Sequence, residues 1–466
     1  MEGQAKDCIH AVEGQLLQGN PDYLFRGVSI NSRTVSKGEL FVCVKGERFD
    51  GHDFLADVIS REAAGIILSD PNLLPDKGSQ AIKTLFVIQV PDTLKALQDL
   101  ASFQRKRFPF KVVAVTGTNG KSTTKEMIAS ILETKFTTLK TQGNLNNHIG
   151  LPLTLLKREP SQEVGVLEMG MSAAGEIKRL AEIAQPDIGI ITNISEGHLV
   201  QLKSLKNIQS AKGELFDSLT KEGTAIVNAD DPLVLEMAQS LRAKTVTFGI
   251  DQPADVRASE IESKDNLGFR FKVKLFDKTL FVHLPYLGYC NIYNTLAALA
   301  TGYSLGIQED AMTRGLENYQ RMSQRNELTQ HNGIDLINDS YNANPRSMTE
   351  ALKTLDNFKT QGRRIFVIGD MLELGDLSIP AHETLGEEIS RSKANILIAV
   401  GKLASLSARR AQALAGEKIQ VLELNEHQEA ADYLIREAKG GDCVMFKGSR
   451  GAAMEKILQI FSANKN

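Results

Sequence analysis

The stretch VAVTGTNGKSTTKEM, residues 113–127, holds the residues whose types and spacing most clearly point to chemistry. It contains the Gly-Lys-Ser that ends a phosphate-binding loop. The common pattern, G-x-x-x-x-G-K-[ST], requires a glycine at position 115, but this chain has Val115. The glycine stands two residues later, as Gly117. Three interpretations are open at this point: a chance resemblance, a damaged loop, or a shorter loop with its own chemistry.

The segments on either side of this loop give it the setting that a phosphate site needs. Residues 111–115, KVVAV, are predicted to form a buried strand, and residues 122–136 to form a helix. One face of that helix carries Met127, Ile128, Ile131 and Leu132. Backbone N–H groups and the helix dipole would point at an anion in the loop. The alternative is a glycine turn that only caps a helix, and the strand and helix together favour the phosphate site.

The residue types in the loop suit nucleotide phosphates with their metal ion. Gly117 and Gly120 lack the Cβ atom where the backbone must approach phosphate closely. Lys121 supplies a charge for the β and γ oxygens, and the hydroxyl of Ser122 or Thr123 can reach a Mg²⁺. The residues predicted to hold the phosphates are therefore Thr116, Gly117, Thr118, Asn119, Gly120, Lys121, Ser122 and Thr123.

Length and composition limit the class of protein. A chain of 466 residues predicts two to four domains, and 42% hydrophobic with 24% charged residues is ordinary for a soluble enzyme. The net charge of -3 gives no polybasic character, so neither nucleic acid nor an anionic membrane is expected as a partner. The N-terminus predicts no signal peptide, and no run of about 18 apolar residues predicts a membrane span. Scattered cysteines predict reduced thiols in a cytoplasmic protein: Cys8, Cys43, Cys290 and Cys443.

Hydrophobic patterning predicts three α/β domains. Residues 1–90 contain short strand-like segments, and the helix-like segment 91–108 leads to Pro109. Residues 91–317 alternate strands with helices, which predicts a mostly parallel sheet in a central domain of the phosphate-loop type. Within it, residues 268–284 alternate like an antiparallel hairpin, so a small antiparallel subsheet is expected. Residues 318–466 start the alternation afresh and predict an open, Rossmann-like sheet.

The loop and several other segments of the chain contain motifs that can be compared with known families. The form T-G-T-N-G-K-[ST]-T resembles that of the Mur ligase family and its folylpolyglutamate synthase relatives. Other segments resemble the family in order along the chain: VSINSRTVSKGELFVCVKGERFDGHDF (28–54), QGNLNNHIGLPLTLL (142–156), VLEMGMSAAGEI (166–177), ITNISEGHL (191–199), SAKGELF (210–216), NDSYNANPRSM (338–348) and VIGDMLELG (367–375). The resemblance covers all three predicted domains, and GNLNN and DSYNANP are similar to the member that adds D-alanyl-D-alanine.

The resemblance implies a ligase that forms an amide bond at the expense of ATP. Its substrates would be a UDP-N-acetylmuramoyl-tripeptide and D-alanyl-D-alanine, joined through an acyl phosphate in the synthesis of peptidoglycan precursors. ATP would be used with Mg²⁺, as two ions. The first domain would bind the uridine diphosphate. A cytoplasmic monomer is expected. Charge neutralisation and positioning are the main needs of such a reaction, because two anions must meet in its first step.

Metal ligands and catalytic residues follow from the same resemblance, alongside Lys121 and Ser122. Glu168 ends a hydrophobic strand, and its oxygens suit Mg²⁺; the alternative is a surface carboxylate. His198 would hold the second ion, although alone it would be interpreted as a loop histidine. Lys212 would bind metal as a carbamate formed with CO₂, which requires a partly neutral amine. Its alternative is an ordinary exposed lysine on a helix.

Contacts to the nucleotide and the substrates are also implied. Those to ATP would come from Asn291, Asn294, Arg325 and Asp339, so that two domains hold it and domain closure completes the site. Those to the substrates would come from Ser29, Asn31, Ser32, Arg33, Asn144, Asn146, Asn147, Tyr341, Asn342 and Asn344. The alternative for the first four is an exposed turn, and for the last two a turn before a helix. Two residues depart from the family's pattern, Asn31 in place of Asp and Cys290 in place of His.

Two other functions compete with this one. A folylpolyglutamate synthase would share the loop, but GNLNN and the segment SINSR argue against it, since folate ligases lack a UDP-binding first domain. A nucleotide-switched binding or motor protein would need no pocket for a second substrate. Dependence of ATP turnover on a UDP-sugar peptide and D-alanyl-D-alanine separates the three.

Overall fold

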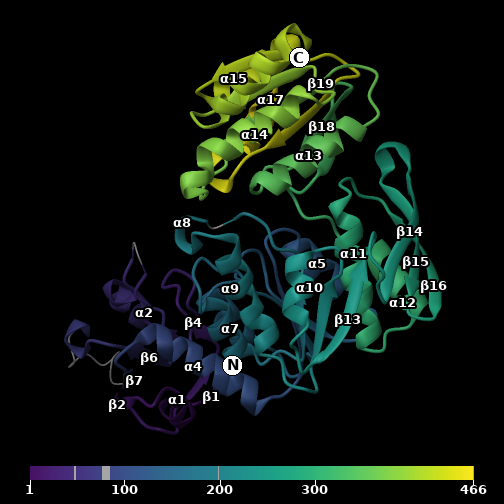
Figure 1. Cartoon of the computed structure of the whole chain (residues 1–466). Coiled ribbons are helices and arrows are strands. Elements are labelled where there is room, and N and C mark those ends of the chain that lie inside the picture. The colour runs from purple at the N-terminus through teal and green to yellow at the C-terminus, as the bar shows by residue number, and fades with distance from the viewer. Residues whose placement is uncertain (47–48, 76–83, 198, 465–466) are drawn as a thin grey trace.

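The computed structural model describes residues 1–46, 49–75, 84–197 and 199–464. In this part of the chain, three α/β units follow one another in sequence, as the colours of Figure 1 show. The first unit holds strands β1–β7, the second holds β8–β16 and the third holds β17–β22. The predicted fold of three α/β domains, with mixed parallel and antiparallel sheets, is confirmed.

The first unit is built on a small sheet whose strands lie in the order β2-β7-β6-β5-β4. Strands β4 to β7 are parallel, and β2 pairs with β7 in the antiparallel direction. The short strands β1 and β3 form a separate antiparallel pair. The bounds are β1 Glu2–Gln4, α1 Ala5–Val12, β2 Gln15–Gln18, β3 Leu24–Arg26, β4 Val28–Ser29, β5 Leu40–Val42, α2 Leu55–Ser60, β6 Gly65–Leu68 and β7 Phe86–Gln89.

Helix α4, Thr93–Arg107, joins the first unit to the second. The carboxylate of Asp92 caps its N-terminus by accepting hydrogen bonds from the backbone N–H groups of Leu94 and Lys95. Its apolar face packs on α1 in the first unit and on α6 and α7 in the second. Leu97 and Leu100 are fully buried there, so the two units share one hydrophobic core.

The second unit is a sheet in the order β16-β15-β14-β13-β12-β11-β8-β10-β9. Strands β8 to β14 run parallel, whereas β15 pairs in the antiparallel direction with both β14 and β16. The β15–β16 hairpin is the one predicted for residues 268–284. The bounds are β8 Lys111–Thr116, β9 Thr138–Lys140, β10 Val164–Glu168, β11 Ile188–Ile191, β12 Thr224–Asn228, β13 Lys244–Gly249, β14 Val256–Ser263, β15 Phe269–Leu275 and β16 Lys278–Leu284.

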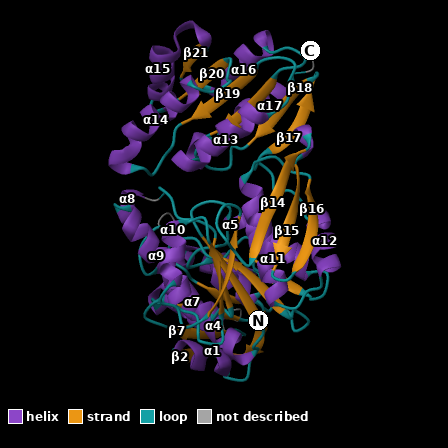
Figure 2. Ribbon diagram, turned by 45° about the vertical axis from the view of Figure 1, so that its right-hand side comes forward, coloured by secondary structure: helices purple, strands orange, loops and turns teal. Residues whose placement is uncertain are grey.

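Helices cover both faces of this sheet. Helix α5 buries Met127, Ile128, Ile131 and Leu132, the four residues expected on one face, against the sheet and against α11 and α12. The bounds are α5 Lys121–Leu132, α6 Gly150–Leu156, α7 Glu176–Ala184, α8 Leu199–Leu202, α9 Leu205–Asp217, α10 Pro232–Ala238, α11 Cys290–Ser304 and α12 Glu309–Asn318. Figure 2 shows the antiparallel strands β14–β16 rising at the side of the unit towards the third unit.

The third unit is an open sheet in the order β17-β18-β22-β19-β20-β21, in which β17 alone of its described strands is antiparallel. Alternate residues of its strands pack on two layers, α13–α15 on one face and α16–α17 on the other. The bounds are β17 Glu327–His331, β18 Ile334–Asn338, α13 Pro345–Asn357, β19 Arg364–Gly369, α14 Ser378–Ser390, β20 Ile396–Val400, α15 Ala404–Ala415, β21 Gln420–Leu424, α16 His427–Glu437, β22 Cys443–Lys447 and α17 Glu455–Ala463.

Two global features agree with the sequence analysis. Among the described helices, none has the length and apolarity needed to cross a membrane. All four cysteines are free thiols, and Cys8, Cys43 and Cys443 are buried. Burial raises the pKa of each of these three thiols far above its usual range, because the thiolate would lose its hydration. They therefore act as small apolar side chains in the cores.

Candidate active site between the second and third units

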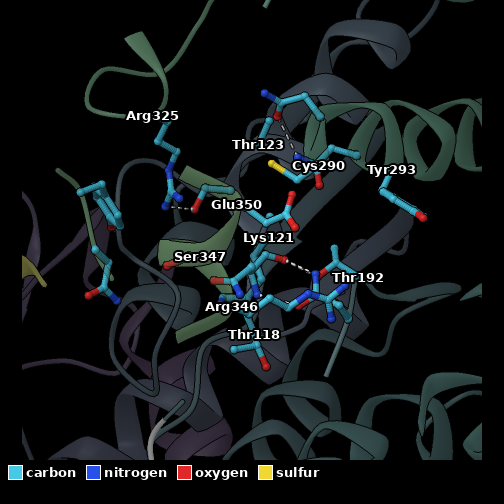
Figure 3. A pocket seen from close by; sticks show the side chains of 18 of the residues that line it. Thr118, Lys121, Thr123, Thr192, Cys290, Tyr293, Arg325, Arg346, Ser347 and Glu350 are labelled. Atoms are coloured by element: carbon cyan, nitrogen blue, oxygen red, sulfur yellow. Dashed lines mark hydrogen bonds between the residues drawn. The ribbon is translucent and has the colours of Figure 1, made fainter. Parts of the chain in front are cut away.

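A cavity of about 830 Å³ lies where the second unit faces the third. The phosphate loop and the start of α11 form one wall, and helix α13 with the chain around Arg325 and Asp339 forms the other. Figure 3 shows side chains from both walls converging on the same space. This position, at the carboxyl ends of parallel strands, is where open α/β sheets bind ligands.

The backbone of the loop requires its two glycines. Gly120 precedes α5 with a φ of 83°, and a Cβ atom there would lie 2.4 Å from Asn294 Oδ1. Gly117 has a φ of 143°, and its Cβ atom would lie 1.9 Å from Thr192 Oγ1. Both positions combine a left-handed φ with a close approach, so no larger residue fits without displacing the loop. The loop is therefore a complete short turn that begins at Gly117.

Strand β11 and the residues after it hold the loop in place. Asn119 N donates a hydrogen bond to Asn193 Oδ1 at 3.1 Å, and Thr192 Oγ1 donates to Asn119 O at 2.6 Å. Thr118 N donates to Asn193 O at 2.9 Å. Thr192 and Asn193 were not singled out from the sequence. Their only signal is that they lie at the end of the strand predicted over residues 187–194, which must lie beside the end of β8 in a parallel sheet.

Two lysines meet behind the loop. Lys121 Nζ donates to the carbonyls of Gly117 at 2.9 Å and Thr118 at 3.1 Å, and Lys212 Nζ donates to the same Gly117 carbonyl at 2.9 Å. Burial lowers the pKa of both ammonium groups, and the charge of Lys121 lowers that of Lys212 further. Lys212 is 2% exposed, which excludes the alternative of a solvent-facing helix residue.

The carboxylate of Glu168 is buried at the end of β10. Its Oε1 accepts a hydrogen bond from Asn146 Nδ2 at 2.7 Å, whereas its Oε2 is buried and has no partner among the described residues. A buried carboxylate oxygen without a partner is costly unless a cation or another donor meets it. The alternative of a surface carboxylate is excluded, because Glu168 is 2% exposed.

His198 lies outside the described residues, so its position relative to Glu168 is not part of the structure described here. Within the described residues, no group of three or more His, Cys, Asp or Glu side chains is close enough to hold a metal ion. The donors that do lie close to Glu168 are of other types. The side-chain amide of Asn146 donates a hydrogen bond to the Glu168 carboxylate, and the positive charge of Lys121 attracts that carboxylate.

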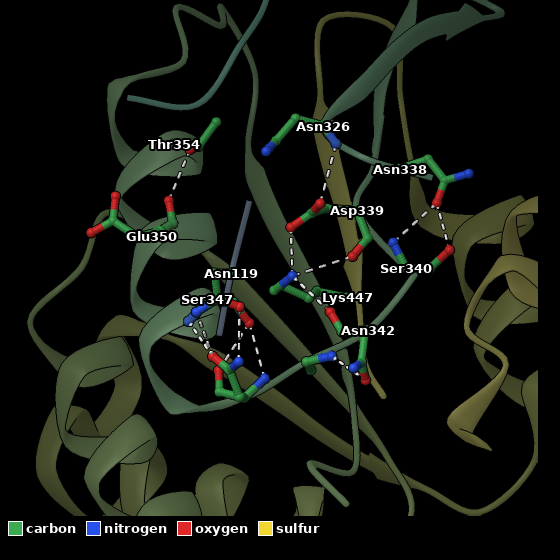
Figure 4. Close-up of polar contacts among 12 residues, drawn as sticks. Asn119, Asn326, Asn338, Asp339, Ser340, Asn342, Ser347, Glu350, Thr354 and Lys447 are labelled. Carbon is green, nitrogen blue, oxygen red and sulfur yellow. Dashed lines mark hydrogen bonds and ion pairs between the residues drawn. The ribbon is translucent and has the colours of Figure 1, made fainter. Parts of the chain in front are cut away.

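The third unit contributes a cation and a carboxylate to the cavity. Arg325 Nη2 donates to Ser122 Oγ at 3.4 Å, and its guanidinium stacks over the ring of Tyr341 at 4.1 Å. Asp339 Oδ2 forms an ion pair with the buried Lys447 at 2.5 Å (Figure 4). Lys447 was missed in the sequence analysis, although it ends the predicted strand 442–448, where such sheets place ligand-binding groups.

Asn344 connects the loop to the third unit by a reciprocal amide pair. Asn344 Nδ2 donates to Asn119 Oδ1 at 2.8 Å, and Asn119 Nδ2 donates to Asn344 Oδ1 at 3.2 Å. The same Oδ1 accepts from Ser347 N at 2.9 Å and so caps α13. Asn342 O accepts from Lys447 Nζ at 3.1 Å. The turn-and-cap interpretation is therefore correct for this segment, and Asn344 in addition contacts the phosphate loop.

Helix α11 presents its first turn to the cavity next to the phosphate loop. Asn294 Oδ1 accepts from Thr124 Oγ1 at 3.1 Å, and Asn294 Nδ2 donates to Asn291 Oδ1 at 3.0 Å. Cys290 lies beside them on the cavity wall. Burial raises the pKa of its thiol to about 12, so at neutral pH it is a neutral, weakly polar group where the motif predicts an imidazole.

Comparison with known proteins decides the family. The models for the Mur ligase family catalytic domain, the Mur ligase middle domain and the Mur ligase glutamate ligase domain match residues 24–105, 115–302 and 321–450. The chain belongs to the Mur ligase family. Together these matches cover all three units of this Mur ligase and include the loop, Glu168 and the Asn344 segment.

Relatives and solved structures of high similarity carry one name. The UDP-N-acetylmuramoyl-tripeptide–D-alanyl-D-alanine ligase of Bacillus subtilis is 38% identical over 97% of this chain and 97% of that protein. The protein of that name from Escherichia coli is 35% identical over 96% of each chain. A crystal structure of MurF from Acinetobacter baumannii has a TM-score of 0.90 at 31% identity, over 100% of this chain and 99% of the other. MurF from Thermotoga maritima in complex with ADP has a TM-score of 0.82 at 29% identity, over 94% and 97%.

Several predicted site residues of this Mur ligase do not line the junction cavity. Thr116 is fully buried, and its hydroxyl donates to Met169 O at 2.8 Å. Asn144 is exposed at the surface, although Asn146 and Asn147 from the same segment line the cavity. Among the described residues, the remaining predicted residues outside the cavity are Gly117 in the loop and four residues of the first unit, Ser29, Asn31, Ser32 and Arg33.

The first-unit residues form a local turn at the end of β4. Arg33 N donates to Asn31 Oδ1 at 3.0 Å, and Asn31 N donates to Ser29 Oγ at 3.2 Å. The side chains of Asn31 and Arg33 are exposed, whereas Ser32 is buried. The exposed-turn description is therefore correct as a description of the backbone, and it leaves the Arg33 guanidinium accessible to an anion.

Proposed function

We propose that this chain is an ATP-dependent amide ligase that adds D-alanyl-D-alanine to a UDP-N-acetylmuramoyl-tripeptide in peptidoglycan precursor synthesis. The observation that carries the proposal is the junction cavity, which brings the phosphate loop, the unpartnered Glu168 oxygen and the α13 wall together. The relatives named for this reaction match the chain over nearly its whole length. ATP use is supported by the ADP complex of the Thermotoga maritima structure.

The reaction would proceed in two steps. A carboxylate oxygen of the tripeptide attacks the γ-phosphorus of ATP, the bond to the β-phosphate oxygen breaks, and ADP leaves. The dipeptide amine then attacks the acyl carbon of the resulting acyl phosphate, a C–N bond forms, and inorganic phosphate leaves as the amine loses a proton. Lys121 and the N–H groups at the start of α5 stabilise the charge that gathers on the transferred phosphoryl group.

The nucleotide would span both walls of the cavity. Its phosphates would lie in the loop 116–123, and Arg325 already contacts Ser122 from the opposite unit. Asp339 and Lys447 would meet the ribose, and the amides of Asn291 and Asn294 the base. These assignments place ATP at the boundary between two units, so that closing the junction completes its site.

Mg²⁺, as two ions, fits the polar groups beside the loop. The ions would neutralise phosphate charge as Lewis acids. Ser122, Glu168 and His198 are the residues we propose to hold them, with the unpartnered Glu168 Oε2 as the supporting observation. Lys212 would join them as a carbamate, since its lowered pKa favours the neutral amine that reacts with CO₂.

The other substrates would enter from two sides. The uridine diphosphate would lie on the first unit at Ser29, Asn31, Ser32 and Arg33, with Arg33 as the natural partner of a diphosphate. The peptide portion would reach the cavity past Asn144, Asn146 and Asn147, and the dipeptide would meet Tyr341, Asn342 and Asn344. We assign domains to residues 1–90, 91–317 and 318–466. We also propose a monomer acting in the cytoplasm.

Product analysis by mass spectrometry tests this function. The chain would be incubated with ATP, Mg²⁺, D-alanyl-D-alanine and UDP-N-acetylmuramoyl-tripeptides that end in lysine or diaminopimelate. The expected product is the corresponding pentapeptide, with one ADP formed per ligation. Glutamate addition to a folate would indicate the folylpolyglutamate synthase alternative. ATP turnover that needs neither substrate would indicate the nucleotide-switched protein.

A further inference from the structure

The cations that line the junction cavity differ in how their charges are engaged. Most of them donate a hydrogen bond to a neighbouring acceptor: Lys121, Lys212, Arg321, Arg325, Lys353 and Lys447. Arg346 also lines the cavity, but no hydrogen bond to its side chain occurs among the described residues. Its nearest charged neighbour is Asp231, whose Oδ2 lies 3.7 Å from Arg346 Nη1.

Asp231 does not need Arg346 as a partner. Its Oδ2 accepts from Ile194 N at 2.8 Å, and its Oδ1 accepts from Leu233 N at 3.1 Å and Val234 N at 3.2 Å. The Asp231 side chain is 4% exposed, whereas that of Arg346 is 46% exposed. The Asp231 carboxylate therefore caps α10 and has all its hydrogen bonds from backbone N–H groups. The N–H groups of the Arg346 guanidinium remain able to bind another anion.

The position of Arg346 brings this charge to the phosphate loop. Arg346 is the second residue of α13, two residues after Asn344, whose amide is paired with Asn119 in the loop. In the view of Figure 3, Arg346 is drawn near Thr118, and its helix α13 forms the cavity wall that faces the loop. A cation in the first turn opposes the helix dipole, so helix stability does not explain its presence there.

We propose that Arg346 binds the terminal carboxylate of the incoming dipeptide, and so orients the dipeptide's amine towards the acyl phosphate. This inference rests on the proposed function. The phosphates already have Lys121, Arg325 and the N-terminus of α5, so they do not require this side chain. The dipeptide carries a single anionic group, at the end opposite its nucleophile, and two residues span about 7 Å when extended.

A guanidinium suits this task because its planar fork donates two parallel hydrogen bonds to a carboxylate. An amide in place of the carboxylate would leave one of these donors unpaired and remove the charge. The loss of such a contact corresponds to about a 10- to 100-fold preference for the free acid. Arg346 would thus determine that the dipeptide enters with a free C-terminus.

The test compares two dipeptides on the full-length enzyme, D-alanyl-D-alanine and D-alanyl-D-alaninamide. We expect the parent chain to prefer the free acid by about 10- to 100-fold in kcat/KM, and Arg346→Gln to reduce this preference to about 1. The loss should fall on the KM for the free dipeptide, with the KM for ATP unchanged. Arg346→Lys, which keeps a point charge without the fork, should retain an intermediate preference.

Lys353→Gln is the matched control, since it removes another cation from the cavity wall, about two turns further along α13. Its preference for the free acid should equal that of the parent chain. Thermal unfolding and ATP binding of each variant establish that it is folded. An Arg346→Gln variant that keeps the parent preference overturns the inference.

A different outcome would reassign the side chain. If Arg346→Gln raises the KM for ATP, or slows tripeptide-dependent ADP formation in the absence of dipeptide, the guanidinium binds phosphate and the inference is wrong. Failure of the parent chain to ligate the free dipeptide at all would instead overturn the proposed function. The two failures are therefore distinguished by the parent chain alone.

Discussion

The second unit meets its two neighbours in different ways. Its junction with the first unit is packed with buried apolar side chains of α4, whereas its junction with the third encloses a cavity bordered by polar side chains, beside apolar contacts that continue the same buried cluster. At the first junction, Leu97 and Leu100 are fully buried, and Arg105 Nε donates to Ala184 O at 2.7 Å beneath them. Separation there would expose apolar surface at about 25 cal/mol for each Å².

Hydrogen bonds that water can replace contribute to the second junction. Asn119 pairs with Asn344 near the loop, and Asn266, at the end of the antiparallel strands, exchanges two hydrogen bonds with the backbone of Lys359 at 2.7 and 2.8 Å. A smaller cavity of about 250 Å³ separates Leu199 from α14. Each such hydrogen bond contributes only about 1 kcal/mol net. The comparison teaches that one junction fixes a scaffold and the other can open for substrates.

The largest effect on activity is expected for Lys121, in the phosphate loop that borders the second junction. Lys121→Ala should lower kcat on the order of 10² to 10³-fold, because the charge on the transferred phosphoryl group loses its nearest ammonium. The melting temperature should stay close to that of the parent chain. Steady-state kinetics and thermal unfolding measure the two quantities. A folded variant with near-normal activity would show that the loop is not the phosphate site.

Lys212→Ala should also be nearly inactive, and small carboxylates separate the possible reasons. If a carbamate is what matters, formate or acetate can occupy the vacated space and supply the missing oxygens, which restores part of the rate. A lost ammonium group would not be replaced by an anion. The rate is measured across a carboxylate titration, with chloride at the same ionic strength as the control. Absence of rescue in a folded variant would contradict the carbamate.

The apolar junction should respond in stability and not in chemistry. Leu97→Ala removes a fully buried side chain and should reduce the free energy of unfolding by about 2–5 kcal/mol. Turnover per folded molecule should be retained well below the melting temperature. Leu414→Ala, at a position that is 49% exposed, is the control and should change stability by less than about 0.5 kcal/mol. Urea unfolding with parallel activity assays tests both. Equal stabilities of Leu97→Ala and the parent chain would show that the buried side chains of this junction do not stabilise the fold.

Removal of the amide pair should weaken closure modestly. Asn344→Ser retains a side chain that can cap α13 but cannot reach Asn119, so kcat/KM for ATP should fall about fivefold, the equivalent of one hydrogen bond. Asn266→Ala, at the other contact, should give a similar loss. Combining the two variants should multiply the losses if both contacts stabilise the same closed arrangement. Unchanged ATP kinetics in both would mean that these contacts do not contribute to closure.

The smallest expected effect is a loss of stability at acid pH that arises from His382 in the third unit. His382 is buried, its Nε2 accepts from Met371 N at 3.0 Å, and burial lowers its pKa below the usual value. In the unfolded chain this imidazole has its ordinary pKa near 6.5, so it binds a proton at a higher pH there than in the folded protein. The contribution of the neutral ring to stability should be present above about pH 6.5 and should be lost as pH falls through the lower pKa of the folded state.

Thermal unfolding against pH measures this effect. The stability of the parent chain should fall by at most about 1.4 kcal/mol for each pH unit from this one proton. His382→Gln should be less stable at neutral pH but should lack this part of the acid dependence. Identical pH profiles for the two proteins would show that His382 does not titrate as described.

Local pattern determined much of the architecture. Most strands of the second and third units were predicted, because each is a run of β-rich apolar residues between turn signals, as in KVVAV (111–115) and RRIFVIGD (363–370). Strands β14, Val256–Ser263, and β17, Glu327–His331, were not predicted. Short edge strands such as β9, Thr138–Lys140, were missed, because three residues carry no periodicity and owe their pairing to β10. The loop, Glu168 and Lys212 were found because motif spacing is a property of the chain itself.

Only the tertiary structure decided which of these residues act together and with what charge. From the sequence of its helix, Lys212 could be either exposed or buried. Only its packing behind Gly117 shows that the side chain is buried and that its pKa is lowered. Lys447 and Thr192 carry no signal beyond a strand end, and Arg346 gains its place beside the loop from the docking of α13. Charge and burial depend on neighbours brought together from distant parts of the chain, and a linear pattern does not encode those distances.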